Sequence, residues 1–175
     1  MNTPSGRFNL ILTIFACAVV GCKTPEAKEP KEKQASILRF HLETNPDDTG
    51  RTLQVPVYRA QPMLVTIGRD AVLDEGFLKT AEVVDADEHG GHAIKVTFDD
   101  AGTRRLEALT IEHRGQHFAI NASWTETRWV AAPLITKRIA NGEYVFTPDA
   151  TREEAERIVA GLKNVIKKLN ERYTL

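Results

Sequence analysis

The sequence predicts an α+β domain in which β-hairpins are combined with two helices. Segments such as residues 37–42 alternate apolar and polar side chains with the period of a half-buried strand. Residues 102–113 and 151–169 instead place their apolar side chains at helical spacing. Two adjacent glycines, Gly90 and Gly91, separate two strand-like segments and permit a tight hairpin. Residues 96–169 alone provide a strand, a helix, a return strand and a closing helix.

Length and composition limit the domain count and the classes of function. The chain has 175 residues, of which 42% are hydrophobic and 27% are charged, and this suits one globular domain with a non-globular extension. Its 23 basic and 24 acidic residues nearly cancel, and neither sign forms a long block. No electrostatic surface for nucleic acid is therefore predicted.

Residues 1–21 have the pattern of a bacterial lipoprotein signal peptide. A short basic start precedes an apolar run, Phe8 to Val20, that is too short to span a membrane. Residues 19–22, Val-Val-Gly-Cys, resemble the lipobox, in which the cysteine becomes the lipidated N-terminus. The alternative is an ordinary secretory signal that is cleaved close to a cysteine. Cys17 would leave with the signal, so no cysteine would remain for a disulfide, a metal or a nucleophile.

The lipobox resemblance implies diacylglyceryl transfer to the sulfur of Cys22 and cleavage after Gly21. Two or three acyl chains hold a protein stably on a bilayer, whereas one chain holds it only marginally. Residues 22–35 are then predicted to be the lipidated Cys and a flexible charged tether. Lys23 to Gln34, rich in Lys, Glu, Pro and Ala, would span at most about 40 Å. The globular domain is predicted at residues 36–175. The expected location is the cell envelope, facing the periplasm, with the outer membrane favoured.

The first half of the domain is predicted to be mostly strand. Residues 37–42 and 53–58 alternate on either side of a turn-rich stretch, 45–50, and are expected to form an N-terminal β-hairpin. Pro56 cannot donate to a ladder, which places its strand at an edge or a bulge. Residues 63–67 form a third predicted strand.

A short helix and a second hairpin follow. Asp74 is expected to cap a helix that runs to Ala81, because apolar residues recur there at helical spacing. Residues 82–86 and 92–98 are predicted strands joined at the two glycines. The hairpin carries one metal-like cluster: Asp85, Asp87, Glu88, His89 and His92. A metal site needs several of these side chains to converge on one point, but neighbouring side chains of a strand point to opposite faces. The favoured interpretation is therefore that these are exposed turn residues and not metal ligands.

The predicted helix at 102–113 begins after the capping carboxylates Asp99 and Asp100 and ends before Gly115. A strand is predicted at 118–122. The next residues read as a loop or hairpin tip with Trp124, Arg128 and Trp129. Exposed Trp and Arg are typical interface anchors, so these three side chains are candidate partner-binding residues. Folding of the tryptophans into the core is an equal alternative.

The closing helix carries the strongest local signals. Thr151 and Glu154 fit a capping box. The apolar side chains that follow form one stripe: Ala155, Ile158, Val159, Leu162, Val165, Ile166 and Leu169. Lysines occupy the outer face and the C-terminal end, where they complement the helix dipole. The helix is therefore predicted to cover a sheet with one face.

An ordered set of short motifs in the second half of the chain resembles one protein family. The motifs are Val96-Thr97-Phe98-Asp99 with Gly102, Leu109-Thr110, Arg114-Gly115, Ala119-Ile120, Ala132-Pro133-Leu134-Ile135, Gly142, Phe146-Thr147 and Glu153-Glu154-Ala155. In order, they resemble the periplasmic head subdomain of SecD and SecDF, the bacterial translocon accessory proteins. The resemblance implies a ferredoxin-like antiparallel sheet with two main helices packed on one face. It also implies a role in handling exported polypeptide.

The chain departs from that family in two respects. SecD proteins have several membrane spans, whereas this sequence has no apolar run long enough for one. The segment between Ile120 and Pro133 also looks longer than in the family. The predicted function is a non-enzymatic, lipid-anchored binding module without a cofactor, whose partners are the membrane and a periplasmic protein or exported polypeptide. A structural envelope lipoprotein, or a metal-dependent enzyme using His89 and His92, is the alternative.

Overall fold

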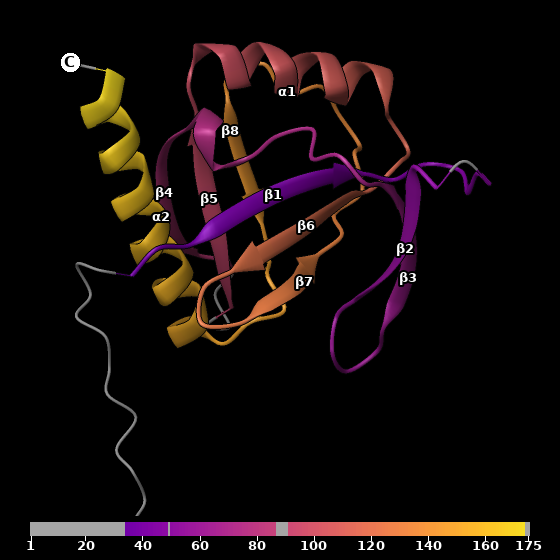
Figure 1. The fold of residues 1–175 in the computed structure, drawn as a ribbon, viewed down its shortest axis with the longest axis horizontal. Helices are drawn as coiled ribbons and strands as arrows, with labels where there is room; N and C mark the ends of the chain where they lie inside the picture. The colour runs from indigo at the N-terminus through magenta and orange to yellow at the C-terminus, as the bar shows by residue number, and fades with distance from the viewer. Residues whose placement is uncertain (1–33, 49, 87–90, 174–175) are drawn as a thin grey trace, which may run out of the picture.

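The computed structural model describes residues 34–48, 50–86 and 91–173, and the statements about structure that follow concern these residues. They form eight strands, a 3₁₀ turn and two α-helices (Figure 1). The elements are β1 (Ile37–Leu42), β2 (Thr52–Val57), β3 (Met63–Gly68), η1 (Glu75–Phe77), β4 (Leu78–Asp85), β5 (His92–Phe98), α1 (Asp100–Glu112), β6 (Phe118–Ser123), β7 (Thr127–Ala131), β8 (Glu143–Phe146) and α2 (Arg152–Tyr173).

The described strands form three small antiparallel sheets, in the orders β1–β6–β7, β2–β3 and β4–β5–β8. The α+β class is therefore confirmed. In Figure 1, β1 and β6 cross in front of β5 and β8, α1 lies along one end, and α2 lies along β4. The expected ferredoxin-like sheet with both helices on one face is not confirmed. Its strands are split between separate sheets, and β8, a four-residue strand, was not predicted at all.

The predicted pairing of the first two strands is wrong. β1 pairs with β6, where Phe40 lies opposite Ile120, and β2 pairs with β3, where Val55 lies opposite Val65. An N-terminal hairpin exists, but β2 and β3 form it. The buried face of β1 explains the long-range pairing, because Leu38 and Phe40 are fully buried among apolar residues that β2 does not supply.

The helix predicted from Asp74 to Ala81 is also largely wrong. Asp74 does cap, and its carboxylate accepts a hydrogen bond from the backbone N–H of Gly76 at 2.8 Å. The turn stops at Phe77, and β4 begins at Leu78 because Leu78 and Ala81 bury their side chains in the core. Tertiary packing thus overrides the local helical spacing. The second hairpin, β4 with β5, is confirmed, although its turn at 87–90 lies outside the described residues.

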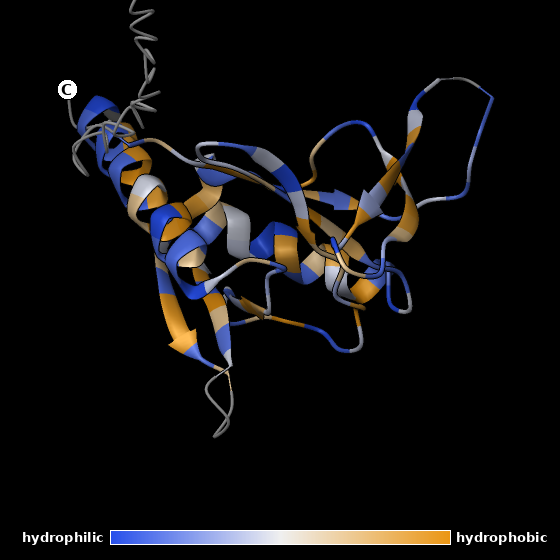
Figure 2. Ribbon diagram, turned by 90° about the horizontal axis from the view of Figure 1, so that it is seen from below, coloured by the Kyte–Doolittle hydropathy of each residue, from blue (hydrophilic) through white to orange (hydrophobic). Residues whose placement is uncertain are grey.

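Both main helices are confirmed with their caps. The Asp99 carboxylate accepts from the N–H of Gly102 at 2.7 Å. Thr151 and Glu154 form the predicted capping box, in which each side chain accepts a hydrogen bond from the other residue's N–H, at 3.2 and 2.7 Å. Hydrophilic and hydrophobic residues both occur along α2, as an amphipathic helix requires (Figure 2). Neither helix of the described chain has the length and apolar character needed to cross a membrane.

The main core lies between the β1–β6–β7 and β4–β5–β8 sheets and is closed by the two helices. Phe40 is its most connected aromatic ring, with edge-to-face contacts to four other rings. A second, smaller cluster lies beneath the β2–β3 hairpin. Its buried members are Val55, Val57, Val65, Ile67, Ala119 and Ala132. The hairpin is therefore packed on the back of β6 rather than projecting freely.

Candidate functional site

The predicted partner-binding residues lie in the hairpin formed by β6 and β7. At its tip the backbone N–H of Trp124 donates to the carbonyl of Glu126 at 2.8 Å. Behind the tip, Thr127 Oγ1 donates to Ser123 Oγ at 2.8 Å. Thr125, Glu126 and Thr127 are exposed, so the tip is available for contact.

The structure brings two of the three predicted residues together and separates the third. The guanidinium of Arg128 lies over the ring of Trp124, 4.9 Å from its centroid, and Trp124 packs at the margin of the main core. Trp129 faces the other way and packs on the second core cluster, 5.1 Å from the His41 ring. Neighbouring residues of a strand point to opposite faces, so Arg128 and Trp129 could not share one surface.

Arg128 is held within an ion-pair network at the start of α2. Its guanidinium lies 3.0 Å from Glu154 and 3.2 Å from Glu126, and it donates to the carbonyl of Asp149 at 3.2 Å. Arg59, which follows the β2–β3 hairpin's first strand, lies 3.4 Å from the Asp149 carboxylate. The Arg128 side chain is only 16% exposed. Its main role in the structure is therefore to join the β6–β7 hairpin to α2 and to orient Trp124.

The electrostatics of Glu154 agree with that role. Partial burial alone would raise the pKa of this carboxyl group. The hydrogen bond from the Thr151 N–H and the positive charges of Arg128 and Arg59 outweigh burial, and the pKa of Glu154 is lowered below its ordinary value. The carboxylate therefore stays charged at neutral pH and serves both as the helix cap and as the partner of Arg128.

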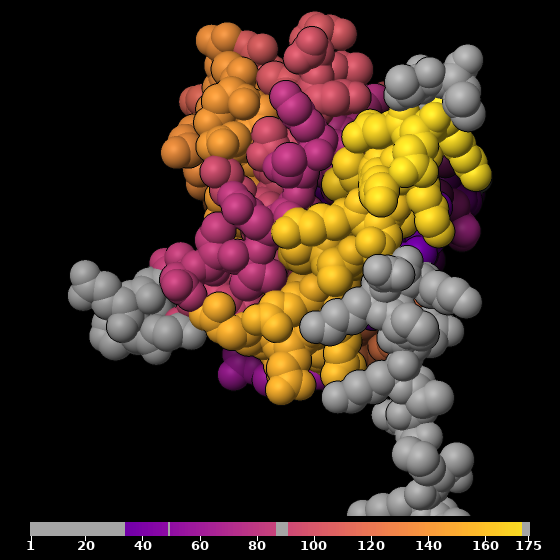
Figure 3. Space-filling view, turned by 90° about the vertical axis from the view of Figure 1, so that its left-hand side faces the viewer, coloured from indigo at the N-terminus to yellow at the C-terminus, as the bar shows by residue number. Residues whose placement is uncertain are grey.

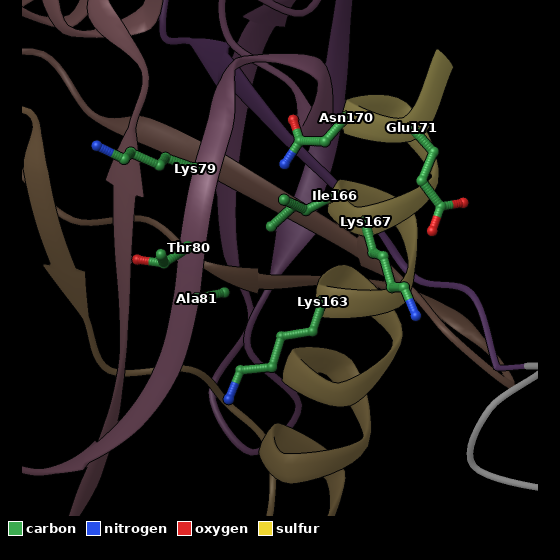
Figure 4. Close-up of a pocket in the computed structure, with 8 residues that line it drawn as sticks. All are labelled: Lys79, Thr80, Ala81, Lys163, Ile166, Lys167, Asn170 and Glu171. Carbon is green, nitrogen blue, oxygen red and sulfur yellow. The ribbon is translucent and has the colours of Figure 1, made fainter. Parts of the chain in front are cut away.

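A second surface feature is a groove between strand β4 and the C-terminal half of α2, with a volume of about 770 Å³. Its lining residues are Lys79, Thr80, Ala81, Lys163, Ile166, Lys167, Asn170 and Glu171 (Figure 4). Ala81 and Ile166 are buried and form the apolar floor. In Figure 4 the side chain of Lys163 extends toward β4, whereas those of Lys79 and Lys167 extend outward on opposite sides of the groove. Among the described strands β4 pairs with β5 alone, so it is an edge strand of its sheet.

Sequence reasoning missed this groove. Lys163 and Lys167 are among the lysines expected on the outer face of the closing helix, and nothing in the local pattern connects them with Lys79. The connection comes from the packing of α2 against β4. A helix was also predicted at residues 74–81, where the structure has the start of β4. The sequence therefore did not indicate that Lys79 lies on an edge strand next to α2.

The remaining predicted site residues are only partly placed. Cys22 and the turn residues Asp87, Glu88 and His89 lie outside the described residues. Asp85 forms an ion pair with Arg152 at 2.5 Å. Among the residues that the structure describes, no group of three His, Cys, Asp or Glu side chains is arranged to hold a metal ion.

Two facing sheets closed by amphipathic helices, with a surface hairpin and a basic groove, make up a small α+β domain. The chain belongs to the family of the SecDF P1 head subdomain, whose model matches residues 51–164. β1 lies before the matched residues, although it supplies the centre of the core.

Known proteins of this group show sequence and fold similarity to the chain. The protein translocase subunit SecD of Calditerrivibrio nitroreducens is 32% identical over 95 residues, which are 54% of this chain and 18% of that protein. A solved structure of SecDF, described as a membrane component that enhances protein export, matches 75% of this chain and 63% of its own, with a TM-score of 0.53 and 19% identity.

SecDF in its super-membrane-facing form matches the same share of this chain and 19% of its own, with a TM-score of 0.54 and 21% identity. At these identities the solved structures show the fold alone. The chain thus spans about a fifth of the SecD subunit and less than two thirds of either solved SecDF chain.

Proposed function

We propose that this protein is a lipid-anchored head domain of the bacterial envelope that binds exported polypeptide on the periplasmic side and catalyses no reaction. Membership of the SecDF P1 head family over residues 51–164 is the observation that carries the proposal. The solved SecDF is described as a membrane component that enhances protein export, and this chain shares the head subdomain of that family. The proposed anchor at Cys22 would hold this domain at a bilayer.

The β6–β7 hairpin tip is the proposed contact for polypeptide. Trp124 presents a partly exposed ring that Arg128 holds in place, and the exposed tip residues Thr125 and Glu126 lie between the paired strands β6 and β7. A rigid aromatic ring beside a guanidinium buries area and hydrogen-bonds at low entropic cost. Trp129 packs on the second core cluster, so we do not include it in the proposed contact surface.

Photo-crosslinking tests this contact directly. A crosslinking residue at Thr125, in the exposed tip, is expected to capture an unfolded precursor polypeptide, whereas one at the exposed Ile111 on α1 serves as the matched control and is expected not to. Trp124→Ala should reduce capture at Thr125 roughly tenfold while leaving the circular dichroism spectrum unchanged. Equal capture by a folded Trp124→Ala variant, or equal crosslinking at both positions, would place recognition elsewhere.

The anchor is tested separately from the contact. Cys22→Ser is expected to leave the protein unacylated and to release it from the membrane fraction, because the thiolate that accepts the diacylglyceryl group is gone. Mass spectrometry of the wild-type mature N-terminus should show an acylated residue 22. An unmodified N-terminus at any other position would contradict the anchor and leave the polypeptide contact to stand on its own test.

A further inference from the structure

The groove between β4 and α2 is surrounded by positive charge. Lys79, Lys163 and Lys167 are exposed, and none of them forms an ion pair with another described residue. The one acidic side chain in the lining is Glu171. The nearest carboxylate along β4, Glu82, is 3.7 Å from Lys95 on the neighbouring strand and is thereby engaged. The groove therefore attracts anions, although the chain as a whole has a formal net charge of −1.

The basic character continues along the last turns of the helix. Lys168 and Arg172 are also exposed there, whereas the acidic residues of α2 other than Glu171 lie in its N-terminal part. In Figure 3 the C-terminal half of α2 and strand β4 lie side by side on one face of the molecule. The lysines thus belong to a continuous surface, which we call the α2–β4 face and define by Lys79, Lys163, Lys167 and the apolar floor between them.

The start of the domain is fixed to α2 beside this face, through helix residues that do not line the groove. The side-chain amide of Asn164 donates to the backbone carbonyl of Gln34 at 2.8 Å. Ser36 is fully buried against Gly161, so closely that a Cβ on Gly161 would lie 2.1 Å from the serine Oγ. The chain therefore leaves the domain within one helical turn of Lys163 and Lys167.

The position of Gln34, where the N-terminal segment joins the domain, limits which surfaces can come close to the α2–β4 face. Twelve peptide units separate Gln34 from Cys22, and they span at most about 40 Å and on average about 20 Å. A protein anchored at Cys22 would hold this face next to the bilayer at a high effective concentration. Lysines close to a bilayer are attracted to anionic lipids, and this attraction acts over about one Debye length, roughly 10 Å.

We infer that the α2–β4 face is a docking surface for anionic phospholipid, on which the domain rests against its own membrane. The inference relies on the proposed anchor for its geometry, since the anchor brings the face to the bilayer. The phosphates of the headgroups would meet Lys79, Lys163 and Lys167, while Ala81 and Ile166 face the space between them. Docking of this face would leave the β6–β7 hairpin, at the opposite end of α2, away from the bilayer.

Vesicle binding by unacylated protein tests the inference. The mature chain from residue 22, carrying Cys22→Ser, is mixed with vesicles of phosphatidylcholine alone or of equal parts phosphatidylcholine and phosphatidylglycerol. We expect binding to the anionic vesicles only, weakening as salt is added. Replacing the three lysines of the face with glutamine should lower the partition coefficient roughly 100-fold, and Glu171→Gln should raise it roughly fivefold.

A matched control separates position from net charge. Arg104, Arg114 and Lys137 are exposed on and after α1, and replacing all three with glutamine removes the same charge from another surface. This control should change the partition coefficient less than about threefold. Equal losses in the two triple variants, or equal binding to both kinds of vesicle, would overturn the inference. All six side chains are exposed, so circular dichroism should show folded proteins in every case.

Two further outcomes keep this test apart from the proposed function. In one outcome the wild type does not bind anionic vesicles, and the triple lysine variant no longer binds an acidic unfolded polypeptide that the wild type binds. The α2–β4 face is then a polypeptide site, and the lipid inference is wrong. If mass spectrometry finds no acyl group on Cys22, the anchor fails, whatever the vesicles show. Because the vesicle assay uses unacylated protein, it supports or overturns lipid binding by the face independently of the anchor.

Discussion

Phe40→Ala is expected to lower the free energy of unfolding by roughly 3–5 kcal/mol. The ring is fully buried at the centre of the main core. It makes edge-to-face contacts, with centroid distances of 5.8 Å to Phe98, 6.1 Å to Phe118, 5.7 Å to Tyr144 and 6.2 Å to Phe146. The substitution removes apolar burial, leaves a cavity and breaks all four ring contacts at once.

Chemical denaturation measures the effect, with Arg39→Ala as the matched control. Arg39 is the exposed neighbour of Phe40 on the same strand, so its truncation should change stability by less than about 0.5 kcal/mol. A domain of this size is stable by only about 5–15 kcal/mol, so the Phe40 variant should be close to unfolding. A loss below about 1 kcal/mol would show that β1 does not pair with β6 as described.

Phe40 also shows where prediction from the sequence succeeds and where it stops. The alternation in residues 37–42 predicted a strand correctly, because burial of one face acts on neighbouring residues. The partner of that strand was predicted wrongly, since the turn-forming stretch at 45–50 favours a local hairpin whereas β6 lies about 80 residues away. The four rings around Phe40 come from β5, β6 and β8, and no local pattern connects them.

Signals carried by a few adjacent residues were read more reliably. The caps at Asp99 and Thr151 depend on contacts within one helical turn, and both were predicted. At Asp74 the cap was predicted correctly but the length of the helix was not. The helix ends after one turn, and strand β4 follows, because its side chains are buried in the core. Local signals determine where an element starts, and tertiary packing decides how far it continues.

The candidate sites follow the same division. The sequence identified Trp124, Arg128 and Trp129 by residue type, but the alternation of a strand divides them between two faces. The cluster of lysines around the groove could not be predicted, because Lys79 lies 84 residues before Lys163 and meets it only through the packing of α2 on β4. Sites assembled from distant segments require the fold before they can be recognised.

Leu162→Ala is expected to lower the free energy of unfolding by roughly 2–5 kcal/mol. Leu162 is fully buried in the middle of the apolar stripe of α2. This helix packs on β4 and β5 of one sheet, on β1 of another and on η1, so it connects two of the three sheets. The residue before it, Gly161, holds Ser36 against the helix, so loosening α2 should also release the start of the domain.

Two measurements distinguish local undocking of α2 from uniform destabilisation. The melting temperature should fall by roughly 5–15 °C, and Lys168→Ala, an exposed change on the same helix, should leave it nearly unchanged. Amide hydrogen exchange should speed up in α2 and at the beginning of β1 more than in β5, because helix and N-terminal segment share the Gly161 and Asn164 contacts. An unchanged melting temperature would mean that α2 is not docked on the sheets, and the α2–β4 face would then lose its structural basis as well.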